Sequence, residues 1–158
     1  MTETSNDQVN RRRSVTNDTV KIFDTTLRDG EQAPGFSMDN DQKRRLALSL
    51  ASRGDFRAVK TIAEEVKGPT ICGLARCREA DIQAVADATA AAERSRIHVF
   101  IGTSPIHRQY KLELDQDAVL DHAVSAVKMA RNLCADVEFS CEDAFRTEQD
   151  YLLRVVNA

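Results

Sequence analysis

The chain has 158 residues, about the size of one domain, so a complete two-domain enzyme is not expected within it. Its 22 Lys and Arg against 25 Asp and Glu give a formal net charge of -3, which excludes the basic footprint of a dedicated nucleic-acid binder. No run of about 18 apolar residues is present, and the polar start MTETSNDQVN lacks the apolar core of a secretory signal. We therefore expect a cytoplasmic protein without a transmembrane helix.

The cysteines and histidines do not form a metal-binding or disulfide pattern. No two cysteines form a CxxC pair, and the three histidines lie at none of the usual zinc spacings. Because free cysteines are often buried, we expect reduced, mostly buried thiols. The four cysteines are Cys72, Cys77, Cys134 and Cys141.

In chain order, hydrophobic periodicity predicts alternating strands and helices after a disordered polar tail over residues 1–18. Near the end, Thr147 and Asp150 resemble a capping box that opens a last helix. The pattern predicts a strand at 20–23, helices at 38–52 and 55–66, a strand at 70–74, a helix at 80–93, a strand at 97–101, a helix at 115–133, a strand at 136–140 and the last helix.

This alternation predicts a parallel α/β sheet, either an open doubly wound sheet or a (β/α)8 barrel. The alternation is interrupted once. Only Arg53 and Gly54 separate the first two helices, which is too few residues for a strand. A barrel also needs eight strands in around 250 residues. We therefore expect residues 19–158 to form an incomplete (β/α) barrel with about four parallel strands.

The loop after the first predicted strand concentrates chemically useful residues. It reads DTTLRDGEQAPG over residues 24–35 and lies at the carboxyl end of a strand, where parallel α/β folds form active sites. A carboxylate there can hold a hard divalent cation, and a neighbouring arginine can grip an oxyanion. The composition alone fits a surface loop with an Arg–Asp pair equally well.

This stretch resembles the LRDGxQ signature of the DRE-TIM metallolyase superfamily, and the resemblance continues from about Val20 to the C-terminus. Within that superfamily the chain is most similar to the bacterial 2-isopropylmalate synthases. The segments that carry this similarity are ICGLAR at 71–76, HVFIGTSPIH at 98–107 and VEFSCEDA at 137–144. The resemblance implies a TIM-barrel fold. It further implies that Asp29 binds the catalytic metal, that Arg28 stabilises the enolate or the keto oxygen, and that Gln32 lies close to the metal.

The strand at 97–101 supplies further candidates. By resemblance His98 faces the substrate, although a lone strand histidine also fits a satisfied barrel-interior residue. The two-residue period of a strand points Phe100 and Gly102 the same way, and Thr103 lies at the strand mouth. We expect His98, Phe100 and Thr103 to bind substrate, and His107 and His122 to be peripheral.

The last predicted strand places three polar residues on one face. Glu138, Ser140 and Glu142 alternate with apolar neighbours, and Ser140 and Glu142 match pocket residues of the family. Because unpaired interior carboxylates are costly, a function explains this face better than structure does. We expect Glu138 and Ser140 to bind substrate and Glu142 to be catalytic, together with Arg28 and Gln32.

The resemblance implies an acyltransferase of leucine biosynthesis that condenses acetyl-CoA with 2-oxoisovalerate in a Claisen reaction. It also implies Mn²⁺ or Mg²⁺, possible K⁺, and a homodimer of the full-length enzyme. Two alternatives stay open: a homocitrate synthase, citramalate synthase or HMG-CoA lyase relative, and a non-catalytic fragment that acts only through association.

Several family features are missing from the sequence. The second barrel strand with its Gly-Phe-Pro turn is absent at Arg53-Gly54, and the His-x-His metal pair of the seventh strand is not reached. Phe145 stands where relatives have a small residue. We therefore expect an N-terminal part of a synthase with an internal deletion that is inactive by itself.

Overall fold

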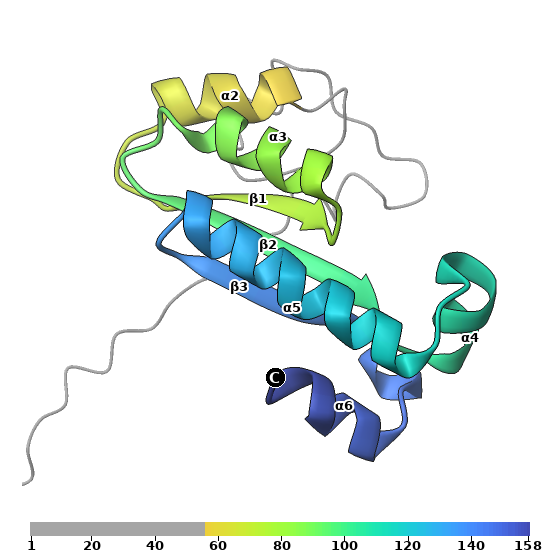
Figure 1. Ribbon diagram of the computed structural model, residues 1–158. Helices are drawn as coiled ribbons and strands as arrows, with labels where there is room; N and C mark the ends of the chain where they lie inside the picture. Colours follow the sequence, from red (N-terminus) through yellow and green to blue (C-terminus); the bar gives the residue numbers. More distant parts are fainter. Residues whose placement is uncertain (1–55) are drawn as a thin grey trace, which may run out of the picture.

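A computed structural model describes the chain over residues 56–158. In this range three parallel strands lie side by side in the order β1–β2–β3 (Figure 1). The tail, the strand at 20–23, the helix at 38–52 and the Arg53-Gly54 junction lie outside the described residues. The strands are β1 (Ile71–Arg76), β2 (Ser95–Gly102) and β3 (Val137–Glu142), so the three expected there are confirmed.

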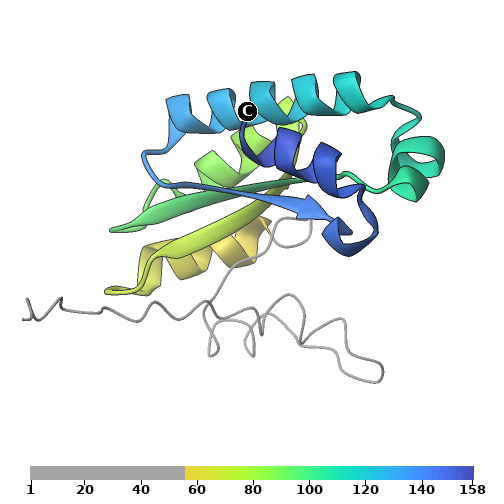
Figure 2. The ribbon, with the colours of Figure 1, turned by 90° about the horizontal axis from the view of Figure 1, so that it is seen from below.

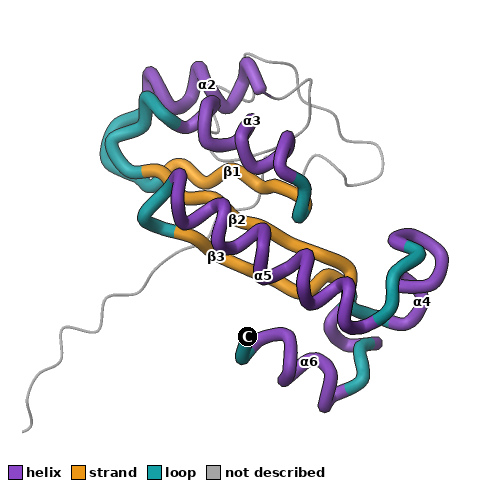
Figure 3. Tube along the Cα trace, in the orientation of Figure 1, coloured by secondary structure: helices purple, strands orange, loops and turns teal. Residues whose placement is uncertain are grey.

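Helices connect the strands in the expected alternation (Figure 3). The helix expected at 55–66 is α2, those at 80–93 and 115–133 are α3 and α5, and the last one is α6. Seen along the sheet in Figure 2, α5 lies over the strands, and α3 packs against β1 and β2 on the same side. Their bounds are α2 (Phe56–Glu65), α3 (Glu79–Thr89), α5 (Gln116–Leu133) and α6 (Gln149–Val156).

The two faces of β2 differ in chemistry because successive strand residues point to opposite faces. Ile97, Val99 and Ile101 are buried, and they pack in the core with residues of α3, α5 and α6. Arg96 and His98 alternate with them and are only partly buried. Burial of the apolar face by the helices therefore fixes which side of the sheet carries the polar residues.

Helix α5 illustrates how local sequence signals set an element. The carboxylate of Asp115 accepts the backbone N–H of Ala118 at 2.8 Å and so caps the first turn. Residues at helical spacing along one side of the helix are buried against the sheet and α6. These residues are Val119, Ala123, Ala126 and Ala130.

The capping box expected for the last helix is wrong. Helix α6 begins one residue later, with Glu148 as its N-cap and no side-chain cap. The Thr147 hydroxyl instead hydrogen-bonds the Thr103 hydroxyl at 2.7 Å and donates to the Asp143 carbonyl at 3.1 Å. A distant hydroxyl just after β2 and a carbonyl just after β3 therefore bind the side chain that the sequence predicts as a cap.

Two short helices that the sequence pattern does not predict follow β2: α4 (Pro105–His107) and the π-helix η2 (Arg108–Leu112). Ser104 precedes Pro105 and accepts the His107 N–H at 3.4 Å, which starts this segment. Glu113, in the left-handed region with φ 56°, ends it. A 3-10 turn, η3 (Ala144–Arg146), follows β3 in the corresponding place.

All four cysteines are free thiols, as expected, but only Cys72 is buried and the other three are partly buried. Cys72 is buried, and burial raises the pKa of Cys72 and of Cys77 to about 12. These two thiols are therefore poor nucleophiles at neutral pH.

Within residues 56–158, no helix combines the length and the apolar character that crossing a membrane requires.

Candidate active site

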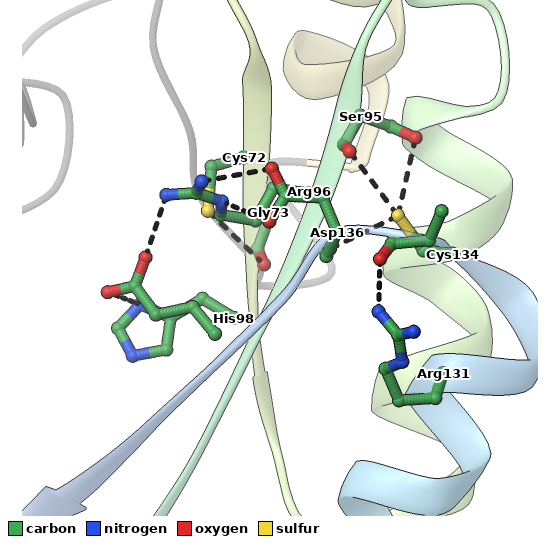
Figure 4. Close-up of polar contacts among 10 residues, drawn as sticks. Cys72, Gly73, Ser95, Arg96, His98, Arg131, Cys134 and Asp136 are labelled. Atoms are coloured by element: carbon green, nitrogen blue, oxygen red, sulfur yellow. Dashed lines mark hydrogen bonds and ion pairs between the residues drawn. The ribbon is translucent and has the colours of Figure 1, made fainter. Parts of the chain in front are cut away.

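The face of the sheet opposite α3 and α5 carries a connected group of polar side chains, which we call the polar face. In the parallel register His98 is paired with Glu138. Ser140 is two residues further along β3 and lies on the same face of the sheet. Figure 4 labels three of its members, Arg96 and His98 on β2 and Asp136 just before β3. The polar face consists of Arg96, His98, Asp136, Glu138 and Ser140.

His98 is held between two residues of β3. Its Nε2 hydrogen-bonds the Ser140 hydroxyl at 2.8 Å, and its Nδ1 lies 3.7 Å from Oε1 of Glu138. Only 13% of the His98 side chain is exposed, so the ring is oriented by its neighbours rather than by solvent. The structure thus brings together three of the residues that the sequence singled out.

Arg96 pairs with two carboxylates of β3 and its preceding turn. Its Nε and Nη2 each donate to Asp136 at 2.9 Å, and its Nη1 donates to Oε2 of Glu138 at 3.1 Å. The hydrogen bond with Asp136 raises the pKa of Arg96 further. Sequence reasoning missed Arg96 and Asp136, although the two-residue period places them on the face of His98 and Glu138.

The carboxylates of β3 are paired, and this corrects the argument made from sequence. Glu138 accepts from Arg96, and Glu142 accepts from the Lys111 ammonium of η2 at 2.6 and 2.9 Å. The premise that interior carboxylates lack partners is therefore wrong. Substrate contact by Glu138 and catalysis by Glu142 remain predictions that rest on the family resemblance.

Thr103 and Phe100 lie in different surroundings. Thr103 is fully buried, with its hydroxyl bonded to Thr147 and its carbonyl accepting from Arg108. In this arrangement Thr103 joins the ends of β2 and β3, so substrate contact would require its hydroxyl to leave Thr147. Phe100 is half-buried and pairs in register with Ser140.

His107, expected from sequence to be peripheral to the site, is half-buried beside the end of β2. It packs against the end of β2 so closely that a Cβ added at Gly102 would lie 2.7 Å from the His107 Cβ. Its Nδ1 lies 3.9 Å from Oδ2 of Asp143, which has a left-handed backbone with φ 63°. His122 is exposed on α5, as expected.

A second polar network connects the segments that follow the carboxyl ends of β2 and β3. Arg108 donates two hydrogen bonds to the Glu148 carboxylate, at 2.9 and 2.7 Å, and its guanidinium lies 4.9 Å from the centre of the Tyr151 ring. The Tyr151 hydroxyl donates to the Gln116 carbonyl at 2.8 Å. The network therefore ties η2, α5 and α6 together next to the polar residues at the strand ends.

The Arg108–Glu148 pair makes stability depend on pH. The hydrogen bonds from Arg108 lower the pKa of Glu148 from 4.5 to about 2. Since the folded pKa lies below the unfolded one, the contribution is complete above about pH 4.5 and disappears as pH falls toward 2. We expect Glu148→Gln to lower Tm at pH 7 and to have little effect near pH 2, measured by thermal denaturation. An equal loss of Tm at both pH values would contradict this assignment.

The signature loop lies outside the described residues, and this applies to Arg28, Asp29 and Gln32 alike. Within residues 56–158, no three His, Cys, Asp or Glu side chains gather in a way that fits a metal ion. The acidic candidates of β3, Glu138 and Glu142, are paired with Arg96 and Lys111. The described part of the chain therefore does not by itself fit the implied divalent cation.

The model of the HMGL-like family matches residues 19–158. The chain belongs to this family. The partial α/β barrel of the TIM type expected from the sequence agrees with this membership and with the three-stranded parallel sheet.

Proteins named 2-isopropylmalate synthase are close relatives. The one from Aquifex aeolicus is 54% identical over 151 residues, covering 87% of this chain and 29% of the relative. That from Heliobacterium modesticaldum is 50% identical over 153 residues, covering 88% and 30%. That from Caulobacter vibrioides is 49% identical over 155 residues, covering 89% and 30%. The chain thus spans about 30% of the length of the relatives it matches.

The matched lengths also show an internal gap. In the Aquifex comparison, 87% of 158 residues is about 137 residues, whereas the match extends over 151 positions. About 14 positions of the relative therefore have no counterpart in this chain. One strand with its connecting turns needs about this many residues.

Proposed function

We propose that the chain carries part of the active site of a 2-isopropylmalate synthase-type acyltransferase, which condenses acetyl-CoA with 2-oxoisovalerate in leucine biosynthesis. The observation that carries the proposal is the hydrogen-bonded His98–Ser140 pair, flanked by Glu138, on the polar face. The relatives named 2-isopropylmalate synthase, about 50% identical over most of this chain, support the same reaction. A cytoplasmic homodimer of the longer protein remains part of the proposal.

In this reaction the chain's residues bind and orient the 2-oxo acid and move protons. The His98 ring and the Ser140 hydroxyl offer hydrogen bonds to the polar end of the 2-oxo acid, with Phe100 as an apolar neighbour. Glu142, at the end of β3, is the proposed acid–base group, and Lys111 holds its carboxylate in place. Arg28 would stabilise the developing oxyanion.

A divalent metal, Mn²⁺ or Mg²⁺, would supply Lewis-acid polarisation of the keto group when bound. Asp29 is the proposed ligand from this chain, and K⁺ is a further cation implied by the family. Since the described residues do not form a metal site, the roles above are those of the protein side chains alone.

A chimera tests the proposal. Residues 95–142 of this chain replace the matching stretch of the Aquifex aeolicus 2-isopropylmalate synthase, which supplies the rest of the enzyme. We expect the chimera to keep activity within about tenfold of the parent, and His98→Ala within it to lose roughly 10- to 100-fold in kcat/KM. The exposed His122→Ala within the same chimera is the matched control. A folded chimera that binds acetyl-CoA but does not accept 2-oxoisovalerate would contradict the substrate assignment.

A further inference from the structure

Arg96 connects every charged group of the polar face, yet neither the sequence motifs nor the proposed reaction gives it a role. Its guanidinium donates to Asp136 through Nε and Nη2 and to Oε2 of Glu138 through Nη1. The other oxygen of Glu138, Oε1, faces Nδ1 of His98 at 3.7 Å. Figure 4 shows Arg96 between Asp136 and the carboxylate next to His98. A continuous path of polar contacts therefore runs from Asp136 to His98.

We propose that Arg96 is a positioning residue that holds the Glu138 carboxylate against Nδ1 of His98 and thereby keeps the imidazole proton on Nδ1. The Nε2 lone pair then accepts the hydrogen bond from the Ser140 hydroxyl. The inference rests on the proposed function only in taking His98 as the substrate-facing histidine. Arg96 acts through Glu138 and does not itself contact the substrate.

The geometry of the guanidinium explains why Arg96 fixes Glu138. Asp136 takes two of the donors in a two-point contact, which orients the plane of the guanidinium and leaves Nη1 for Glu138. The side chain of Arg96 is 25% exposed, so both contacts are partly shielded from water. Without Arg96, the carboxylates of Asp136 and Glu138 would repel each other, because both lie on the same face of the sheet.

The electrostatics explain why the proton stays on Nδ1. An ionised carboxylate only accepts hydrogen bonds, so Glu138 stabilises the tautomer that directs an N–H toward it. One guanidinium faces two carboxylates, which leaves this group of three with a net negative charge beside the ring. The hydroxyl of Ser140 can donate or accept, and it therefore adapts to the tautomer that Glu138 selects.

Nitrogen NMR of the 158-residue chain tests the proposal directly. Two-bond ¹H–¹⁵N correlation spectra, recorded without substrate at a pH that leaves the ring neutral, report which nitrogen of His98 carries the proton. The signals of His98 are assigned by their loss in His98→Gln. We expect the Nδ1–H form in the native chain. In Arg96→Met and in Glu138→Gln the ratio of Nδ1–H to Nε2–H should fall by about tenfold.

A matched control removes a neighbouring arginine that does not contact Glu138. Arg131 hydrogen-bonds the Ala135 carbonyl, and Arg131→Met should leave the tautomer of His98 unchanged. Methyl signals of Ile97 and Val99 report whether each variant keeps the core. Glu138→Gln preserves shape, so it decides the question if Arg96→Met does not fold.

The proposal is overturned if native His98 is the Nε2–H form, or if folded Arg96→Met or folded Glu138→Gln keeps the native tautomer. Since no substrate is present, these outcomes do not depend on the reaction that the longer protein catalyses. A failed chimera with the expected tautomer change would refute the proposed function and leave the role of Arg96 intact. An active chimera with no tautomer change would support the proposed function and refute the role of Arg96.

Discussion

Mixed with acetyl-CoA and 2-oxoisovalerate, the purified 158-residue chain is expected to release thiol no faster than the uncatalysed background. The chain spans about 30% of its relatives, and about 14 positions of their matched stretch have no counterpart in it. Loss of a strand from a barrel displaces the later strands relative to the signature loop that carries Arg28 and Asp29. Misplacement of reacting groups by about 1 Å already costs on the order of 100-fold in rate.

The assay follows free coenzyme A with a thiol reagent and needs a correction for the protein's own thiols. A sample without acetyl-CoA supplies that baseline, and the raised pKa of Cys72 and Cys77 makes these two thiols slow to react. The full-length Aquifex relative is the positive control for the assay. Turnover of the 158-residue chain on the order of 1 per second or faster would show that the missing segment is dispensable.

Titration with Mn²⁺ is expected to give weak binding, in the millimolar range, that Asp29→Ala abolishes. A single carboxylate with waters holds Mn²⁺ or Mg²⁺ weakly, because most coordination positions lack protein donors. Among the described residues, none of the acidic clusters fits a metal ion, and Glu138 and Glu142 are engaged by cationic side chains. Asp29 is therefore the one carboxylate of this chain that we expect to matter.

Isothermal calorimetry measures this binding, and Asp121→Ala is the control because Asp121 is an exposed carboxylate on α5. We expect Asp121→Ala to bind Mn²⁺ as the native chain does. Micromolar affinity in the native chain would mean that further ligands converge with Asp29. Unchanged binding in Asp29→Ala would remove Asp29 from the site.

The order and type of the main elements in residues 56–158 could be predicted from sequence because each one has a strong local signal. Ile97, Val99 and Ile101 recur with a two-residue period, which sets a strand with one buried face. Asp115 followed by apolar residues at helical spacing sets α5. Such signals depend on neighbours within a few residues, so the chain alone determines them.

The short elements and the loop contacts could not be predicted in this way. Thr147 has the sequence of a helix cap, but the buried hydroxyl of Thr103 lies within hydrogen-bond distance only after β2 and β3 pair. His107 follows a Ser-Pro turn, and its close packing on Gly102 depends on the path of α4. Contacts between residues about 40 positions apart have no local signature.

The sequence by itself determined the family, the parallel alternation of strands and helices, and the face on which His98, Glu138, Ser140 and Glu142 lie. These follow from periodicity and from motifs, which are properties of the linear chain. Only the tertiary structure decided the partners of those residues. The register of β2 against β3 brings Arg96 to Glu138 and His98 to Ser140, and the π-helix brings Lys111 to Glu142. The carboxylates of Glu138 and Glu142 have no cationic neighbour in their own strand. Their partners, Arg96 and Lys111, come from other elements of the fold.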